Sequence, residues 1–164
     1  MVIGVISDTH GFYHPALDDV FSAVDHILHA GDIGRLEVLD LLAQLAPVTA
    51  VYGNVDGQEM RKELPETAET HLGGIRFVMT HIAGRPGKWQ RNMDKFLSQD
   101  PPDVFVCGHS HILQIERVKE LQNMLFLNPG AAGMQGLHKI KTCVRIEIES
   151  GKLTGADVIH LDDQ

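Results

Sequence analysis

The chain has 164 residues, 43% of them hydrophobic and 22% charged, and its formal net charge is −8. This length suits one globular domain spanning 1–164, since domains usually have about 100–200 residues. The negative charge argues against duplex nucleic acid as a partner, because neutralising its phosphates requires a broad basic surface.

Membrane proteins and disulfide-stabilised scaffolds are also disfavoured. No apolar run reaches the ~18–20 residues that a spanning helix needs, and the first residues lack the pattern of a signal peptide. Cys107 and Cys143 both lie in apolar runs and are too few for a disulfide framework. We therefore expect a cytoplasmic protein that does not bind membranes.

Short β-rich runs alternate with helical patterns along the first two thirds of the chain. Strands are expected at 2–7, 26–30, 48–53 and 103–108, with a hairpin over 67–80. Apolar residues at helical spacing predict helices near 17–24, 38–45 and 89–97. The last of these helices would carry Trp89 and Met93 on its apolar face.

Beyond Leu113 the pattern changes to four strands joined by short turns, which predicts a β meander. The whole order predicts one α/β domain with a sheet that is partly parallel and partly antiparallel.

A side chain able to bind metal follows strand after strand. Each one alone is more simply explained as a turn or capping residue. The carboxyl ends of parallel strands meet at one edge of a sheet, however, so these side chains should converge. The set comprises Asp8, His10, Asp32, Asn54, His81, His109 and His111.

The chemistry of this set favours two divalent ions. Oxygen and imidazole ligands without a thiolate suit Mn²⁺, Fe²⁺, Zn²⁺ or Ni²⁺. Seven side chains are too many for one ion with an open position, but they suit two ions that share a carboxylate. Two ions about 3.5–4 Å apart form a clamp for in-line attack on phosphorus.

The motifs that carry these residues resemble those of the calcineurin-like metallophosphoesterase superfamily. In chain order they read SDTHG, HAGD, YGNVD, MTH, CGHSH and NPG, and they run from Asp8 to Gly130. The most similar branch is the small single-domain phosphodiesterases of bacteria and archaea. That branch also resembles the smallest retromer subunit, a scaffold with little or no catalysis. The resemblance implies a four-layer αββα sandwich of two mixed β-sheets flanked by helices.

The resemblance also implies a role for each ligand. The first ion would be held by Asp8, His10, Asp32 and His111, and the second by Asp32, Asn54, His81 and His109. Mn²⁺ is the favoured metal, with Ni²⁺, Zn²⁺ and Fe²⁺ as alternatives. Asp32, Asn54 and His109 are assigned as catalytic residues.

The function implied is hydrolysis of a small or nucleotide-like phosphodiester through in-line attack by a metal-bridging hydroxide. The alternative is a metal-binding scaffold or protein-interaction module with little or no catalysis. The sequence leaves the oligomeric state open.

Several positions depart from the family pattern. Val55 stands where many members have a histidine that assists the leaving group, so we expect activity to depend on leaving-group pKa. Asp56 is either a turn residue or a carboxylate that orients a metal ligand.

Five further residues are candidates for substrate contact. Arg85 and Lys88 are either a clamp for the substrate or part of an ordinary basic surface. His14 is a candidate because it lies close to the first motif. His138 and Lys139 are better explained as residues of the turn before the next strand, with a phosphate contact as the alternative.

Overall fold

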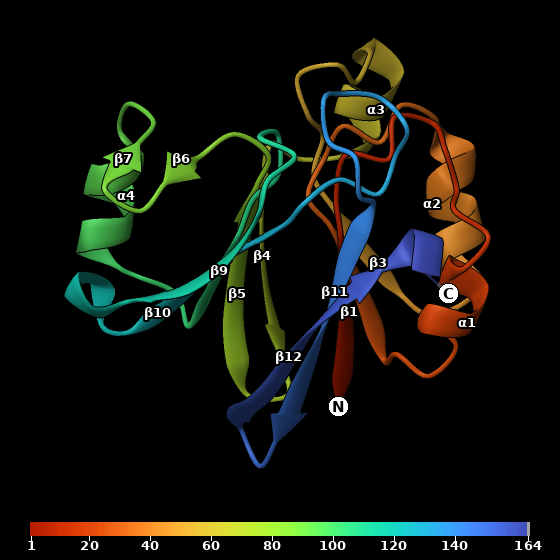
Figure 1. Ribbon diagram of the computed structural model, residues 1–164. Helices are drawn as coiled ribbons and strands as arrows, with labels where there is room; N and C mark the ends of the chain where they lie inside the picture. Colours follow the sequence, from red (N-terminus) through yellow and green to blue (C-terminus); the bar gives the residue numbers. More distant parts are fainter. Residues whose placement is uncertain (164) are drawn as a thin grey trace.

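The computed structural model describes residues 1–163, and one of its two large sheets is built from both ends of the chain (Figure 1). Its strand order is β12-β11-β1-β2-β3, in which β1, β2 and β3 are parallel and β11 and β12 are antiparallel neighbours. The strands are β1 (Val2–Ile6), β2 (His26–His29), β3 (Val48–Ala50), β11 (Thr142–Glu149) and β12 (Lys152–His160).

The middle of the chain forms the second sheet, with the order β4-β5-β8-β10-β9. Strands β5, β8 and β10 are parallel, whereas β4 and β9 pair antiparallel at the two edges. The strands are β4 (Thr67–Leu72), β5 (Ile75–Thr80), β8 (Val104–Val106), β9 (Leu113–Val118) and β10 (Met124–Pro129).

Short helices cover the outer faces of the two sheets (Figure 1). The first sheet is covered by α1 (Leu17–Val20) and α2 (Leu36–Ala43), and the second by α4 (Met93–Gln99), the 3₁₀ turn η1 (Lys119–Leu121) and a small hairpin of β6 (Gly84–Arg85) and β7 (Lys88–Trp89). The remaining elements are α3 (Gln58–Glu63) and η2 (Leu161–Asp163).

Side chains that alternate along a strand enter different apolar cores, which gives the fold its layers. In β8, Val104 and Val106 enter the core between the two sheets, while Phe105 enters the core beneath α4. In β10, Leu125 and Phe126 are divided between the same two cores. Successive side chains of a strand point to opposite faces, so strands buried on both faces read as continuous apolar runs. The expected sandwich of two mixed sheets flanked by helices is confirmed.

Four details of the expected elements are corrected. The strands after Leu113 are not one meander, because β9 and β10 belong to the second sheet and β11 and β12 to the first. The helix expected over 17–24 is shorter, and α3 was not predicted. Trp89 lies in β7 and not in a helix, since Gly84 and Gly87 adopt positive φ around Pro86 and turn the chain into a hairpin.

In the part of the chain that the structure describes, no helix has the length and apolar character needed to cross a bilayer.

Candidate metal centre

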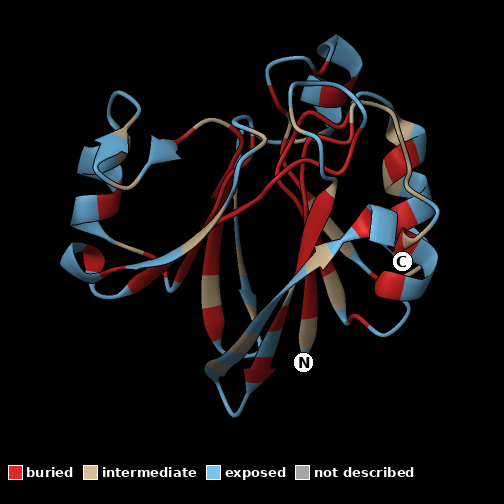
Figure 2. Ribbon diagram, viewed as in Figure 1, coloured by how far each residue is buried: buried red, intermediate tan, exposed pale blue. Residues whose placement is uncertain are grey.

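The loops that follow β1, β2, β3, β5 and β8 converge at one end of the sandwich (upper part of Figure 1). Much of this loop cluster is buried, as Figure 2 shows, although loops usually lie on the surface. The polar residues expected at the strand ends are therefore brought together.

One group comprises Asp8, His10 and His111, whose ligand atoms lie within 4.8 Å of one another. The Nε2 atoms of His10 and His111 are 3.3 Å apart, and Nε2 of His111 lies 3.1 Å from Oδ1 of Asp8. Three ligand atoms thus face one point, although His111 is 101 residues from His10.

The two oxygens of Asp8 have different surroundings. Oδ2 accepts hydrogen bonds from the Ser7 hydroxyl at 2.6 Å and from the backbone N–H of His109 at 3.0 Å. Oδ1 is buried and has no hydrogen-bond partner. A buried polar atom without a partner is costly in a folded protein, so Oδ1 is available for a cation.

A second group comprises Asp32, His81 and His109. Nδ1–H of His81 donates to the carbonyl of Ala30 at 2.7 Å, which leaves Nε2 as the free nitrogen of the ring. That Nε2 is buried without a hydrogen-bond partner and lies 3.2 Å from Oδ2 of Asp32. Oδ1 of Asp32 is occupied by the backbone N–H of Val55 at 3.0 Å.

The two groups adjoin. Nε2 of His81 is 3.9 Å from Oδ1 of Asp8, and the rings of His81 and His109 have centroids 5.3 Å apart. Burial acts to lower the pKa of His81, but the carboxylates of Asp32 and Asp8 outweigh it and raise that pKa. The contact with Asp8 likewise raises the pKa of His111. The centre therefore attracts positive charge.

Backbone strain is concentrated at the same residues. Of the nine non-glycine residues with positive φ among residues 1–163, five are Asp8, His10, Asp32, His109 and His111. Left-handed backbone is unfavourable for such residues and is typical of functional sites. Gly53 and Gly108 make room for the two carboxylates, because a Cβ at either position would collide with Asp32 or Asp8.

Asn54 and Asp56 of the YGNVD motif have different surroundings. Asn54 lines a cavity of about 140 Å³ together with His81, a member of the second group. Asp56 does not touch a ligand side chain. Its buried carboxylate accepts backbone N–H groups from Ile33, Gly34 and Gly53, so it ties the loop carrying Asp32 to the loop carrying Asn54.

Arg61 on α3 reinforces the Asn54 loop and was not predicted from the sequence. Its guanidinium donates to the carbonyl oxygens of Asp56 at 2.8 Å, Gly53 at 3.1 Å and Asn54 at 3.3 Å. The same group lies 4.5 Å from the centre of the Tyr52 ring. The only signal for this contact would have been a prediction of helix α3 from the sequence.

His138 lies on the loop before β11, as its interpretation as a turn residue predicts, and its ring also contacts His111. Its Nε2–H donates to the carbonyl of Gly133 at 2.9 Å, and its Nδ1 lies 3.2 Å from Nδ1 of His111. With Nε2 protonated, Nδ1 of a neutral His138 is an acceptor, so His111 donates Nδ1–H to it. His111 thereby presents an unprotonated Nε2 toward Asp8 and His10.

The candidate substrate contacts are divided between different places. His14 pairs with Asp162 at 3.3 Å and does not belong to either ligand group. Arg85 and Lys88 line a cavity that His109 also borders. Lys139 is exposed on the loop between β10 and β11.

The side chains present fit two divalent cations. Each group offers one carboxylate and two imidazoles, and neither contains a thiolate, a donor set suited to first-row divalent metals. The unpartnered Asp8 Oδ1 and His81 Nε2 point to the place that such ions would fill.

Comparison with known proteins agrees with this geometry. The family model for the calcineurin-like phosphoesterase superfamily domain matches residues 1–151. A probable metallophosphoesterase of Methanocaldococcus jannaschii is 36% identical over 155 residues, which cover 91% of this chain and 77% of the relative.

Two solved structures share the fold. One, described as a novel archaeal phosphodiesterase, has a TM-score of 0.73 and 26% identity, and the match covers 97% of this chain and 100% of that one. The other is wild-type Vps29 of Entamoeba histolytica complexed with zinc, with a TM-score of 0.73, 22% identity and coverage of 98% and 99%.

Proposed function

Because this chain belongs to the calcineurin-like phosphoesterase superfamily, we propose that it is a phosphodiesterase that hydrolyses a small or nucleotide-like diester at a dinuclear metal centre. Family membership supports a metal-dependent phosphoesterase, and the similarity to an archaeal phosphodiesterase supports a diester substrate. The observation that carries the proposal is the pair of adjoining ligand groups with two buried, unpartnered ligand atoms.

The proposal assigns roles to the residues of the site. Two divalent ions, most suitably Mn²⁺ with Ni²⁺, Zn²⁺ or Fe²⁺ as alternatives, would supply Lewis-acid activation of water and of the phosphoryl group. Asp8, His10 and His111 would hold the first, Asn54, His81 and His109 the second, and Asp32 both. His109 is the exposed member of its group, so its ring lies at the entrance that a substrate would use.

The reaction forms one bond from phosphorus to a water oxygen and breaks the bond to the leaving oxygen. No side chain that could protonate the leaving oxygen occupies position 55, because Val55 is apolar and 53% exposed. We therefore expect rates to fall steeply from nitrophenyl to phenyl to methyl esters. Equal rates across this series would show that another group donates the proton.

The proposal also concerns the domain organisation, the partners and the location of the protein. Residues 1–164 would act as one catalytic domain on a small-molecule diester, without duplex nucleic acid or membrane as a partner. The free, buried Cys107 and Cys143 suit a cytoplasmic location, where thiols stay reduced.

Exposed apolar side chains near the centre favour the second candidate function, a metal-binding scaffold. Ile112 is 66% exposed next to His111, and Met134, Leu137 and Ile140 are exposed on the loop that carries His138. Apolar side chains gathered at one place on a surface are typical of protein contacts, and the similarity to Vps29 supports the same alternative.

Hydrolysis assays separate the two candidates. Chelator-treated protein, restored with each divalent metal, would be given bis(4-nitrophenyl) phosphate and 4-nitrophenyl phosphate. We expect metal-restored diester turnover that falls about 100-fold or more in Asp32→Asn. The exposed Asp40→Asn on α2 serves as the matched control and should retain turnover. Folded protein that is inactive with every metal would favour the scaffold.

A further inference from the structure

A second cavity lies beside the metal centre. It has a volume of about 470 Å³ and is bordered by the β6–β7 hairpin and by the loop after β8. Its lining includes Arg85, Lys88, Gln90, Ser110 and Gln114 together with His109, a member of the second ligand group. A group bound in this cavity would therefore be next to a phosphate bound at the metals.

Two cations border this cavity without acidic partners. Arg85 and Lys88 are directly opposite each other in the hairpin, and neither forms an ion pair within residues 1–163. Like charges at opposed positions destabilise a strand pair. This arrangement therefore has an electrostatic cost that a bound anion would relieve.

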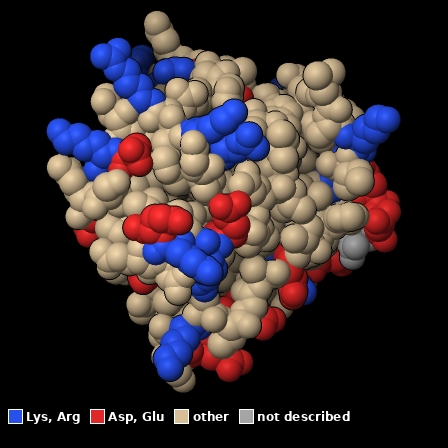
Figure 3. All heavy atoms as spheres, turned by 60° about the vertical axis from the view of Figure 1, so that its left-hand side comes forward, with Lys and Arg blue, Asp and Glu red and all other residues tan. Residues whose placement is uncertain are grey.

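Acidic residues are absent from the described lining of this cavity, although the chain as a whole has a net charge of −8. Figure 3 brings the hairpin side of the molecule forward, and Lys and Arg side chains dominate its upper part, whereas most Asp and Glu side chains lie lower. The local charge next to the second ligand group is thus opposite to that of the whole protein.

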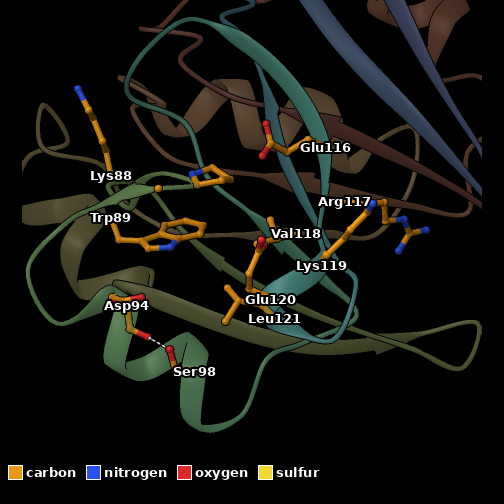
Figure 4. Close-up of a pocket in the computed structure, with 12 residues that line it drawn as sticks. Lys88, Trp89, Asp94, Ser98, Glu116, Arg117, Val118, Lys119, Glu120 and Leu121 are labelled. Atoms are coloured by element: carbon orange, nitrogen blue, oxygen red, sulfur yellow. Dashed lines mark hydrogen bonds between the residues drawn. The ribbon is translucent and has the colours of Figure 1, made fainter.

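Aromatic packing anchors the β6–β7 hairpin on the second sheet. Trp89, the next residue after Lys88, packs against Phe105 and Phe126, with ring centroids 6.2 and 5.6 Å away. Neighbouring residues of a strand point to opposite faces. In Figure 4 the Lys88 side chain accordingly points away from Trp89 and from Asp94 on α4.

The hollow in Figure 4, on the Trp89 side, is larger, at about 780 Å³, but it carries both signs of charge. Its lining includes Lys88, which borders both hollows, together with Asp94, Glu116 and Glu120. It includes none of the metal-ligand candidates. It therefore lacks the one-sided charge and the position that distinguish the smaller cavity.

Ser110 adds a donor inside the smaller cavity. Its hydroxyl oxygen accepts hydrogen bonds from the side-chain amide of Asn128 at 3.1 Å and from the backbone N–H of Ile112 at 3.2 Å. Both interactions use the oxygen as acceptor, so the hydroxyl hydrogen is available to an anionic oxygen.

We propose that this cavity binds an additional oxyanion of the substrate, a carboxylate or phosphate on the substituent that stays attached to the reacting phosphorus. The inference rests on the proposed function and narrows the substrate class to phosphodiesters that carry a further negative charge. Arg85 and Lys88 are then specificity-determining residues.

A matched pair of substrates tests this proposal. Both are 4-nitrophenyl diesters, and the second substituent is 4-carboxyphenyl in one and 4-carbamoylphenyl in the other. They share a leaving group and a shape and differ in one charge. We expect the Mn²⁺-restored protein to prefer the carboxylate about tenfold in kcat/KM, since each of the two partly exposed ion pairs contributes a few-fold.

The preference should disappear in Arg85→Gln/Lys88→Gln. The control Lys95→Gln/Lys152→Gln removes the same charge from α4 and β12 and should keep the preference. The ratio of the two substrates within each variant is the measured quantity, because it cancels differences in folding and metal content. Turnover of both diesters without a preference would overturn the subsite and leave the phosphodiesterase standing.

A binding measurement covers the case in which neither diester is hydrolysed. Trp89 is the only tryptophan of the chain and is part of the hairpin, next to Lys88, so its fluorescence can follow titrations with 4-carboxyphenyl and 4-carbamoylphenyl phosphate. We expect tighter binding of the carboxylate in wild type and in the control, and equal binding of both ligands in Arg85→Gln/Lys88→Gln. Equal binding in wild type would overturn the anion subsite whatever the activity.

Discussion

His138 acts on the metal centre through another side chain. By accepting Nδ1–H of His111 it fixes which nitrogen of that ring faces Asp8. Residues behind a metal ligand usually contribute about 10–100-fold to metal affinity. They do so by holding the ligand's tautomer and ring orientation.

We expect His138→Leu to weaken binding of one of two Mn²⁺ ions by about tenfold or more. His138→Asn, whose amide oxygen can replace Nδ1 as acceptor, should restore much of this affinity. Calorimetric titration measures both, with the exposed His71→Leu as control. Equal affinities in wild type and His138→Leu would refute this role.

His29 makes folding stability depend on pH. The ring is fully buried, with Gly31 N–H donating to its Nδ1 and Thr9 Oγ1 next to its Nε2. Burial lowers its pKa from 6.5 to about 4. Above pH 6.5 the ring is neutral in both states, but as the pH falls toward 4 only the unfolded chain gains the proton.

Stability should therefore be lost between these two pH values, by up to roughly 3 kcal/mol from this residue. Urea unfolding at several pH values measures the loss. His29→Gln, which cannot be protonated, should show a shallower decline than wild type. Parallel curves would mean that other groups cause the acid sensitivity.

Among the elements, the surface helix α3 is connected to the metal centre through the side chain of Arg61. Arg61 holds three carbonyl oxygens of the 53–56 loop with one guanidinium, and this loop carries Asn54. A lysine keeps the charge but has no planar fork to reach all three oxygens.

We expect Arg61→Lys to weaken binding of the second ion by about tenfold, because it loosens the loop behind a ligand. The adjacent exposed Lys62→Gln should bind both ions normally. Metal titration distinguishes the two variants. If Arg61→Lys kept both affinities, the loop would be held by Asp56 alone.

For the molecule as a whole, apolar packing stabilises the fold, and the metal centre lies in the loops at one end of the sandwich. The three cores are built from apolar side chains of both sheets and of the elements that cover them, so their packing does not require a bound metal. Removing the metal should therefore abolish activity without unfolding the chain.

Mn²⁺ at 100 times its Kd should stabilise the protein by about 3 kcal/mol, which raises Tm by roughly 5–10 °C. Asp32→Asn should lose most of this rise. Circular dichroism and thermal melts with and without chelator measure both effects. A chelated protein without native secondary structure would show that the packing of the cores does require the metal.

Local signals in the sequence were sufficient to predict the strands and the residues after them that we propose as metal ligands. Apolar runs bounded by Asp, Asn or His mark β1, β2, β3, β5 and β8, and parallel strand ends gather at one edge. The split of β9–β12 between two sheets has no such signal, because antiparallel strands look alike in either sheet.

Local patterns in the sequence specified the strands, the types of the proposed ligands and their order along the chain, since strand periodicity and strand ends are local properties. The division into four layers was expected only from the family resemblance. Three contacts became known only from the folded chain: Arg61 holds the Asn54 loop, His138 orients His111, and His14 pairs with Asp162. The tertiary structure also placed Arg85 and Lys88 beside His109. Each of these contacts depends on tertiary packing, and tertiary packing leaves no periodic pattern in the sequence.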